Sequence, residues 1–167
     1  MKDNELLNGG EIVKWTAKEV STFIEQKQYI DTVLIPLLPI SFGVSVKESA
    51  NSTEFIQLLV SRLEHQFKGR ILLLPGVPYT QDSSLDEKEQ LIQSWKGFIE
   101  KQENFKHIIF LSTDTNWKTI SDLKDDSFLW IPSVPLEHLE EKYRQSIIDD
   151  QVKQLLNFFI QKWQKFD

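Results

Sequence analysis

Four short apolar runs, separated by stretches with helical periodicity, are the feature that most limits how this chain can fold. The runs lie at about residues 32–39, 70–75, 107–111 and 127–132. Each run is continuous rather than alternating, which is typical of parallel strands that are buried on both faces. Because amphipathic helical stretches separate the runs, the sequence predicts an α/β fold. We expect a three-layer, small Rossmann-like domain with a four-stranded, mostly parallel sheet and a long C-terminal helix.

Capping residues and one proline predict where individual elements begin and end. Thr16, with Glu19 three residues later, has the spacing of a capping box, so a helix is expected to start after Thr16. A second helix is expected to begin at a cap formed by Asn51 or Ser52. Pro36 lies within the first apolar run and offers no backbone donor. The first strand is therefore expected to end or bulge at Pro36, or to lie at an edge of the sheet.

The length of the chain fits a single domain. With 167 residues, of which 40% are hydrophobic, one core can bury about two-thirds of the unfolded surface. Residues 1–12 are polar and contain Gly9 and Gly10, so we expect a disordered tail there. We expect residues 13–167 to form one α/β domain. Residues 76–84 are rich in turn-forming residues and are expected to be a loop.

Charge and composition argue against several classes of partner and cofactor. The chain carries 19 Lys and Arg against 25 Asp and Glu, a net charge of −6, which argues against nucleic acid as a partner. It has no cysteine, and its histidines show no ligand spacing, so neither a disulfide nor a zinc site is expected. Magnesium bound by carboxylates stays open on the sequence, but no metal ligand is assigned. Phosphate-binding and nucleophile motifs are missing, so no cofactor and no catalytic residue is assigned. The longest apolar run, residues 33–40, is too short to span a membrane, and the N-terminus has no leader pattern, so we expect a cytoplasmic protein.

Polar residues that follow the predicted strands form the candidate ligand-binding site. In open parallel sheets, ligands bind outside the carboxyl ends of the strands, because successive loops meet there. The residues that we expect to converge at this edge are Ser41, Tyr79, Thr80, Asp114 and Ser133. The sequence therefore predicts that a small-molecule or nucleotide-type ligand, if the chain has one, binds at this edge.

Asp114 has two competing interpretations. A carboxylate directly after a buried strand is a common position for a metal ligand or a general base. The same residue is well placed to cap a short helix that begins near Asn116, by accepting hydrogen bonds from its first backbone amides. Capping is the interpretation that we favour.

The last helix is predicted to be longer than the sheet requires. It is expected to run from about residue 140 to residue 166, a length of about 40 Å. Its apolar residues keep a spacing of three or four throughout. The excess length either closes the chain's own core or packs on another copy or on a protein partner. In the second case the candidate interface residues are Phe158, Trp163 and Phe166.

Several segments resemble a known bacterial family. They are residues 14–19 (KWTAKE), 29–32 (YIDT), 34–37 (LIPL), 65–70 (HQFKGR) and 73–75 (LLP). These segments are similar to the YpiF-like proteins of Bacillus-type bacteria, and the resemblance covers nearly the whole chain after the first dozen residues. It implies a bacterial, cytoplasmic protein. Because that family is a domain of unknown function, the resemblance transfers no catalytic residue to this chain.

Two functions remain open on the sequence. The first is a non-enzymatic protein-interaction or self-associating module, which is supported by the missing catalytic signatures and the long last helix. The second is a small-molecule or nucleotide-type binder, or a weak hydrolase, that uses the loops at the carboxyl edge of the sheet. The sequence favours the first function and leaves enzymatic activity unassigned.

Overall fold

Strands and helices alternate along the chain, as the apolar pattern predicts. The computed structural model describes residues 12–63, 69–103, 105–120 and 127–166. In chain order the elements are β1 (Val13–Lys14), α1 (Ala17–Glu25), β2 (Thr32–Ile40), α2 (Val46–Leu63), β3 (Ile71–Leu73), β4 (Val77–Thr80), α3 (Leu85–Gln102), β5 (His107–Ser112), the 3₁₀ helix η1 (Thr115–Thr119), β6 (Phe128–Trp130) and α4 (Glu141–Phe166).

All strand pairs of the described residues are parallel, and β2 lies at the centre of the sheet. The strand order is β1-β3-β2-β5-β6, with β4 paired to the C-terminal half of β2. The predicted α/β class and the parallel sheet are confirmed, but the sheet has six strands rather than four. The additional strands are β1 and β4. β1 has only two residues, and β4 contains Pro78 within the segment expected to be a loop, so neither forms an apolar run.

Pro36 does not end β2, because the partner of β2 is interrupted instead. Leu34 pairs with Leu73, and Leu37 pairs with Val77, so the partner contains one more residue than β2 between these two pairs. This extra residue is a bulge that separates β3 from β4. On this side of the sheet, the Leu34 carbonyl accepts a hydrogen bond from the backbone N–H of Leu74. Because backbone hydrogen-bonding groups alternate from one side of a strand to the other, the backbone of Pro36 faces the same side. Pro36, which has no backbone N–H, therefore lies opposite the gap between β3 and β4. β2 continues past it as the central strand.

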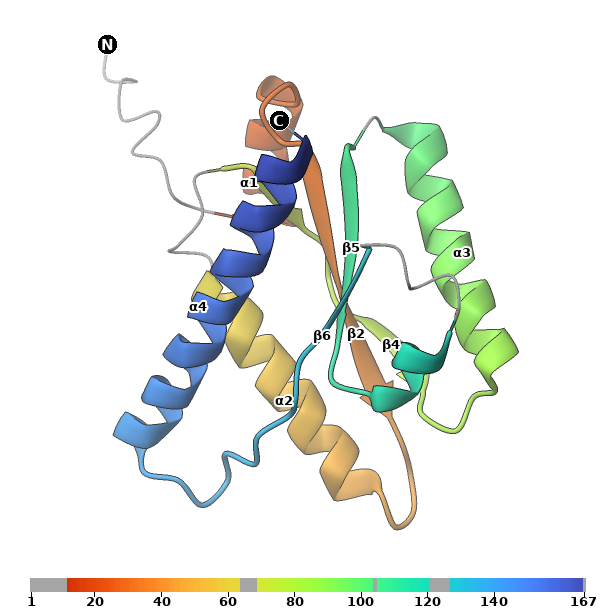
Figure 1. Ribbon diagram of the computed structural model, residues 1–167, viewed down its shortest axis with the longest axis vertical. Coiled ribbons are helices and arrows are strands. Elements are labelled where there is room, and N and C mark those ends of the chain that lie inside the picture. Colours follow the sequence, from red (N-terminus) through yellow and green to blue (C-terminus); the bar gives the residue numbers. More distant parts are fainter. Residues whose placement is uncertain (1–11, 64–68, 104, 121–126, 167) are drawn as a thin grey trace.

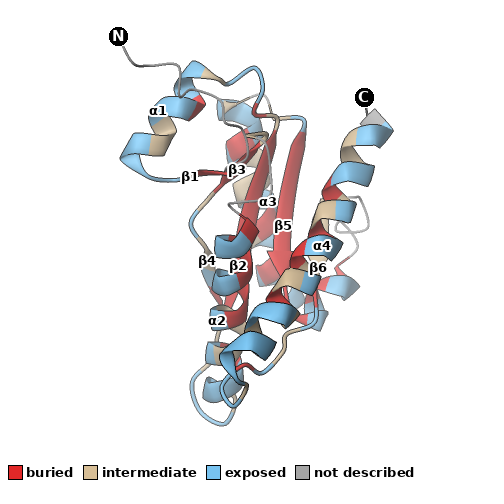
Figure 2. Cartoon of the chain, turned by 90° about the vertical axis from the view of Figure 1, so that its left-hand side faces the viewer, coloured by how far each residue is buried: buried red, intermediate tan, exposed pale blue. Residues whose placement is uncertain are grey.

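Helices cover both faces of the sheet, which gives the expected three layers (Figure 1). α2 and α4 pack on one face, over a core that includes Leu34 and Phe159. α3 and η1 pack on the other face, over a core that includes Ile35, Phe110 and Trp117. Successive residues of β2 alternate between these two cores, which is why its apolar run is continuous. Figure 2 shows the buried strands β2 and β5 between helices whose outer faces are exposed.

The first helix begins as its cap predicts, whereas the second begins earlier than expected. The Thr16 side chain accepts a hydrogen bond from the backbone N–H of Glu19, and α1 starts directly after Thr16. The expected start of the next helix at Asn51 or Ser52 is wrong, because α2 already contains both residues. The Asn51 side-chain amide donates to Ser133 Oγ at 3.2 Å. This side chain therefore holds the loop that follows β6 rather than the end of its own helix.

Most of the expected N-terminal tail, residues 1–11, lies outside the described residues. Ile12, the last residue of that tail, is fully buried in the core beneath α2 and α4. β1 follows it and pairs with β3 at the edge of the sheet.

Candidate functional site

The loops at the carboxyl ends of the central strands diverge to opposite faces of the sheet. The loop after β2 leads to α2, whereas the loops after β4 and β5 lead to α3 and η1 on the other face. Such divergence of neighbouring loops opens the ligand crevice of parallel sheets. This edge is therefore the region in which the sequence-predicted site residues can be compared with the structure.

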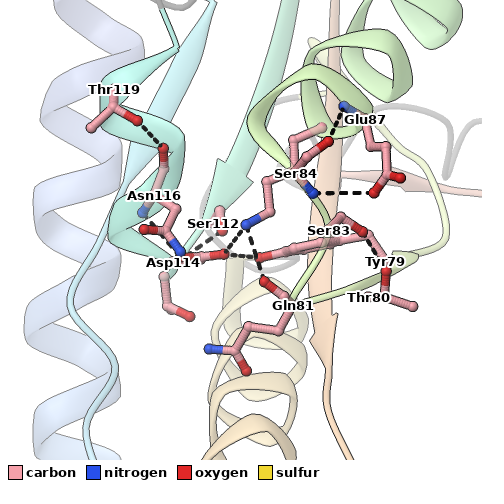
Figure 3. Close-up of polar contacts among 12 residues, drawn as sticks. Tyr79, Thr80, Gln81, Ser83, Ser84, Glu87, Ser112, Asp114, Asn116 and Thr119 are labelled. Atoms are coloured by element: carbon pink, nitrogen blue, oxygen red, sulfur yellow. Dashed lines mark hydrogen bonds and ion pairs between the residues drawn. The ribbon is translucent and has the colours of Figure 1, made fainter.

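Three side chains from three segments meet at this edge in a buried polar network (Figure 3). Tyr79 in β4 donates its hydroxyl hydrogen to Asp114 Oδ2 over 2.9 Å. Lys88 in α3 places Nζ 3.4 Å from the same carboxylate oxygen and donates to the Gln81 carbonyl at 3.2 Å. The backbone N–H of Asp114 donates to Ser112 Oγ at 3.0 Å. The network joins the ends of β4 and β5 to the start of α3.

Burial determines the electrostatics of this network. The Lys88 and Asp114 side chains are only 2% and 5% exposed, so water screens their attraction little. Burial, reinforced by the neighbouring Asp114 carboxylate, raises the pKa of the Tyr79 hydroxyl well above its usual value, so Tyr79 remains a donor. Asp114 also caps η1, because its Oδ1 accepts from the backbone N–H of Asn116 at 3.0 Å. Both carboxylate oxygens of Asp114 therefore have partners within the chain.

The five sequence-predicted ligand residues form separate groups. Tyr79 and Asp114 bind one another, and this contact is the one hydrogen bond that joins two of the five in the described part of the chain. The Thr80 hydroxyl pairs with a serine hydroxyl in its own turn. Ser41 and Ser133 each hydrogen-bond to a polar side chain of α2. Of the five residues, only Tyr79 and Asp114 therefore form a buried pair. The other three make hydrogen bonds that hold their own loops in place.

Lys88 belongs to the network but was not identified from the sequence. It precedes Ile92 by about one helical turn and shares the buried face of α3 with Ile92 and Ile99. A lysine on an apolar stripe is the signal that points to it, since such a lysine is either paired or lays its stem over apolar surface. Its Nζ lies 5.7 Å and 5.9 Å from the ring centroids of Tyr79 and Trp117. These rings enclose the charge and add cation–π attraction.

The network contains groups used in catalysis, but they are already bound to one another. A lysine, a carboxylate and a phenol within hydrogen-bond reach can transfer protons. Here a substrate would reach Asp114 only after the ion pair with Lys88 or the hydrogen bond from Tyr79 had broken. The geometry therefore favours a structural role for this network: it holds β4, β5 and α3 together.

The loop between β2 and α2 places exposed apolar side chains at the same carboxyl edge of the sheet. We call residues 42–46 the apolar loop. Within it, Phe42 is 88% exposed and Val46 is 47% exposed, while Val44 is fully exposed. Gly43 has φ of +89°, a conformation that glycine adopts at low cost. Figure 1 shows the loop at the bottom of the molecule, beyond the end of β2.

Hydrogen bonds hold the base of the apolar loop. The buried Ser49 Oγ accepts from the backbone N–H of Ser41 at 3.2 Å and donates to the Val46 carbonyl at 3.0 Å. Beside the loop, Lys47 and Glu137 form an ion pair at 2.9 Å. The loop is thus fixed at its base, while its apolar side chains extend into solvent. Its sequence signal is the alternation of apolar residues at 42, 44 and 46 in a segment that is not a strand.

Two of the three candidate interface residues near the end of α4 make contacts within the chain. Phe158 and Trp163 are partly buried and pack against the core beneath α4. Trp163 Nε1 donates to Thr32 Oγ1 at 2.9 Å, and the Arg70 guanidinium lies 4.5 Å from the Trp163 ring centroid. The side chain of Phe166 lies outside the described residues. These contacts support the interpretation that the last helix closes its own core.

Fold and site together define a doubly wound, parallel α/β domain whose carboxyl edge holds a buried polar network and an exposed apolar loop. The chain belongs to the family described as "Protein of unknown function (DUF2487)", whose model matches residues 21–163. It is 35% identical over 152 residues to the "Uncharacterized protein YpiF" of Bacillus subtilis (strain 168), a match that covers 90% of this chain and 98% of that protein. The resemblance to the YpiF-like proteins is therefore confirmed. No solved structure matches the chain.

Two further observations concern metals and membranes. Within the described ranges, no three His, Cys, Asp or Glu residues lie together as a metal site would require. None of the helices seen there has both the length and the apolar character needed to cross a bilayer.

Proposed function

We propose that the chain is a non-enzymatic protein-interaction module whose contact surface is the apolar loop, residues 42–46. The observation that carries this proposal is the exposure of Phe42 and Val44, at 88% and 105% of their reference areas, at the tip of one loop. Single exposed apolar residues are common on protein surfaces. Adjacent ones on a protruding segment are instead typical of surfaces that contact another protein.

The fixed base of the loop supports this proposal. Because Ser49 bonds to both ends of the turn, little conformational entropy remains to be lost when the loop binds. A phenylalanine at the tip supplies the kind of aromatic anchor that fills an apolar recess in a partner. The partner that we propose is therefore a protein chain with such a recess, either another protein or a second copy of this chain.

The polar network argues against the alternative of a small-molecule binder at the same edge. Its three side chains are buried and satisfy one another, so a polar ligand would have to replace existing contacts. The apolar loop requires no such rearrangement.

The proposal is tested with a photo-crosslinking residue placed at Phe42 in cells that produce the chain at its natural level. Ile24, which is 64% exposed on α1, is the matched control position. We expect one discrete adduct from position 42, lost when Val44→Ser is added, and none from position 24. An adduct of twice the chain mass identifies a second copy, and any other discrete mass identifies a different protein. No adduct at position 42, or equal adducts at both positions, would overturn the proposal.

A further inference from the structure

An apolar hollow lies away from the carboxyl edge, beside the interruption between β3 and β4. Its volume is about 530 Å³, and its walls come from α1, α3 and this interrupted edge of the sheet. The aromatic rings that line it are those of Trp15, Phe23, Trp95, Phe98 and Phe105. We call this hollow the edge pocket. Its volume is in the range of small-molecule sites, roughly 300–1,000 Å³, and such sites are mostly apolar and aromatic.

The sheet edge beside the edge pocket is unsuited to pairing with another strand. The backbone N–H of Gln81 donates a hydrogen bond to the Ile40 carbonyl of β2. Because backbone groups alternate in direction along a strand, those of Tyr79 face β2 and those of Pro78 face outward. Pro75, which lies in the interruption, also lacks a donor. Prolines at such positions protect an edge against strand addition. The edge pocket is therefore better suited to a small molecule than to an extended peptide.

Charged side chains surround one end of the edge pocket. A smaller hollow of about 340 Å³ adjoins it, and the two share Glu103 among their lining residues. Glu103 is paired with Lys27 at 2.6 Å, and Asp31 is paired with Arg70 at 2.9 Å. Lys106 also lines the smaller hollow and forms no ion pair with any described residue. The uncompensated charge at this end is therefore positive.

We propose that the edge pocket binds an amphiphilic carboxylate of the fatty-acid class. The acyl chain lies among the aromatic rings, where burial of its methylene groups supplies the driving force. The carboxylate lies beside Lys106, where the positive charge is not already compensated. Trp15 and Phe98, which are 53% and 58% exposed, border the pocket and lose contact with water when the chain enters. This inference is independent of the proposed function, because it involves none of the residues of the apolar loop.

The apolar part of the proposal is tested with decanoate and 1-decanol as probes. Binding is followed by tryptophan fluorescence, because Trp15 and Trp95 line the pocket. We expect a saturable change with decanoate below the concentration at which it forms micelles. Phe98→Asp places a carboxylate at the mouth and is expected to weaken binding of both probes by about tenfold or more. Circular dichroism checks that this variant is folded, as the exposure of Phe98 predicts.

The position of the carboxylate is tested separately. Lys106→Gln is expected to weaken decanoate binding by about three- to fivefold and to leave 1-decanol binding unchanged. Lys101→Gln is the matched control, because Lys101 is exposed on α3 and lines neither hollow. The absence of a saturable change, or undiminished binding by Phe98→Asp, would overturn the pocket. Equal effects of Lys106→Gln on both probes, or no effect on either, would overturn the placement of the carboxylate.

Discussion

At the scale of single residues, Lys88 is unusual because its side chain, which ends in an ammonium group, is only 2% exposed. An ammonium group removed from water is tolerated only with a partner, and here Asp114 provides it at 3.4 Å. The same aspartate accepts a hydrogen bond from the Tyr79 hydroxyl and caps η1. One carboxylate therefore joins two strand ends, a helix and a 3₁₀ turn, which is why we expect its replacement to affect stability strongly.

Replacing Asp114 with asparagine is expected to lower the free energy of unfolding by about 3 kcal/mol. The amide preserves the size of the side chain and an oxygen for the η1 cap, but it leaves the buried Lys88 charge uncompensated, which typically costs about 3–5 kcal/mol. Urea denaturation followed by circular dichroism measures the loss. The double variant Asp114→Asn with Lys88→Met also removes the unpaired buried charge. It is expected to recover part of the free energy of unfolding that the single variant loses. A loss below about 1 kcal/mol in the single variant would contradict this account.

At the scale of elements, the interruption between β3 and β4 is what allows a proline in the central strand. Strand pairing on that side resumes only because the segment between them contains an extra residue. Gly76 lies in this segment, where the sheet edge approaches the side chain of Leu38 closely. A Cβ atom at position 76 would lie 2.7 Å from Leu38 Cγ. The glycine is therefore required by space, not by an unusual backbone angle.

We expect Gly76→Ala to destabilise the chain by about 1–3 kcal/mol, the usual cost of overpacking a core. Gly97→Ala is the matched control, because a Cβ at position 97 meets nothing within 4 Å. Position 97 lies inside α3, so this substitution is expected to stabilise the chain by up to about 1 kcal/mol through helix propensity. Thermal unfolding of the two variants in parallel makes the comparison. Equal effects of the two substitutions would show that Leu38 moves aside.

The long α4 is explained by what its final turns contact. Trp163 bonds to Thr32 at the start of β2 and is covered by the Arg70 guanidinium. Arg70 in turn makes two hydrogen bonds to Asp31, both at 2.9 Å. The last turns of α4 therefore fasten the amino end of the sheet, which accounts for length beyond the central strands.

At the scale of the whole molecule, two depressed pKa values predict how stability responds to acid. Burial lowers the pKa of His107 below its ordinary value of 6.5. Burial alone would raise the pKa of Asp31, but hydrogen bonds from Arg70 and Thr32 outweigh it and lower the pKa below 3.8. In both cases the folded chain binds protons less readily than the unfolded chain. Their contributions are therefore present above the unfolded values and are lost as pH falls.

We expect the free energy of unfolding to decrease in two stages as pH falls. The first begins near pH 6.5, as the unfolded chain protonates His107, and the second begins near pH 3.8, as it protonates Asp31. The slope of each stage is at most about 1.4 kcal/mol per pH unit for a single proton. Urea titrations between pH 8 and pH 3 measure both. His107→Gln should abolish the first stage and retain the second, and an unchanged profile in that variant would refute the assignment.

Local patterns predicted much of this fold, but they did not predict β1 and β4. β2, β3, β5 and β6 follow from apolar runs, and the start of α1 follows from the Thr16 cap. β4 had no such signal, because it pairs with a part of β2 beyond Pro36 that the proline was expected to disrupt. In the candidate site, Asp114 and Tyr79 were found from their positions after strands, whereas Lys88 was obscured because a lysine on a helix is usually exposed.

The amino-acid sequence by itself determined the α/β class and the parallel sheet, and it pointed to the family. Strands buried on both faces need unbroken apolar runs, and helices that cover them need apolar stripes, so these features are written along the chain. Tertiary structure alone decided that Lys88 meets Asp114, that Pro36 faces a broken partner and that the apolar loop remains uncovered. Each of these depends on strand register and on which distant segments meet or fail to meet, and the local pattern of apolar residues does not specify that.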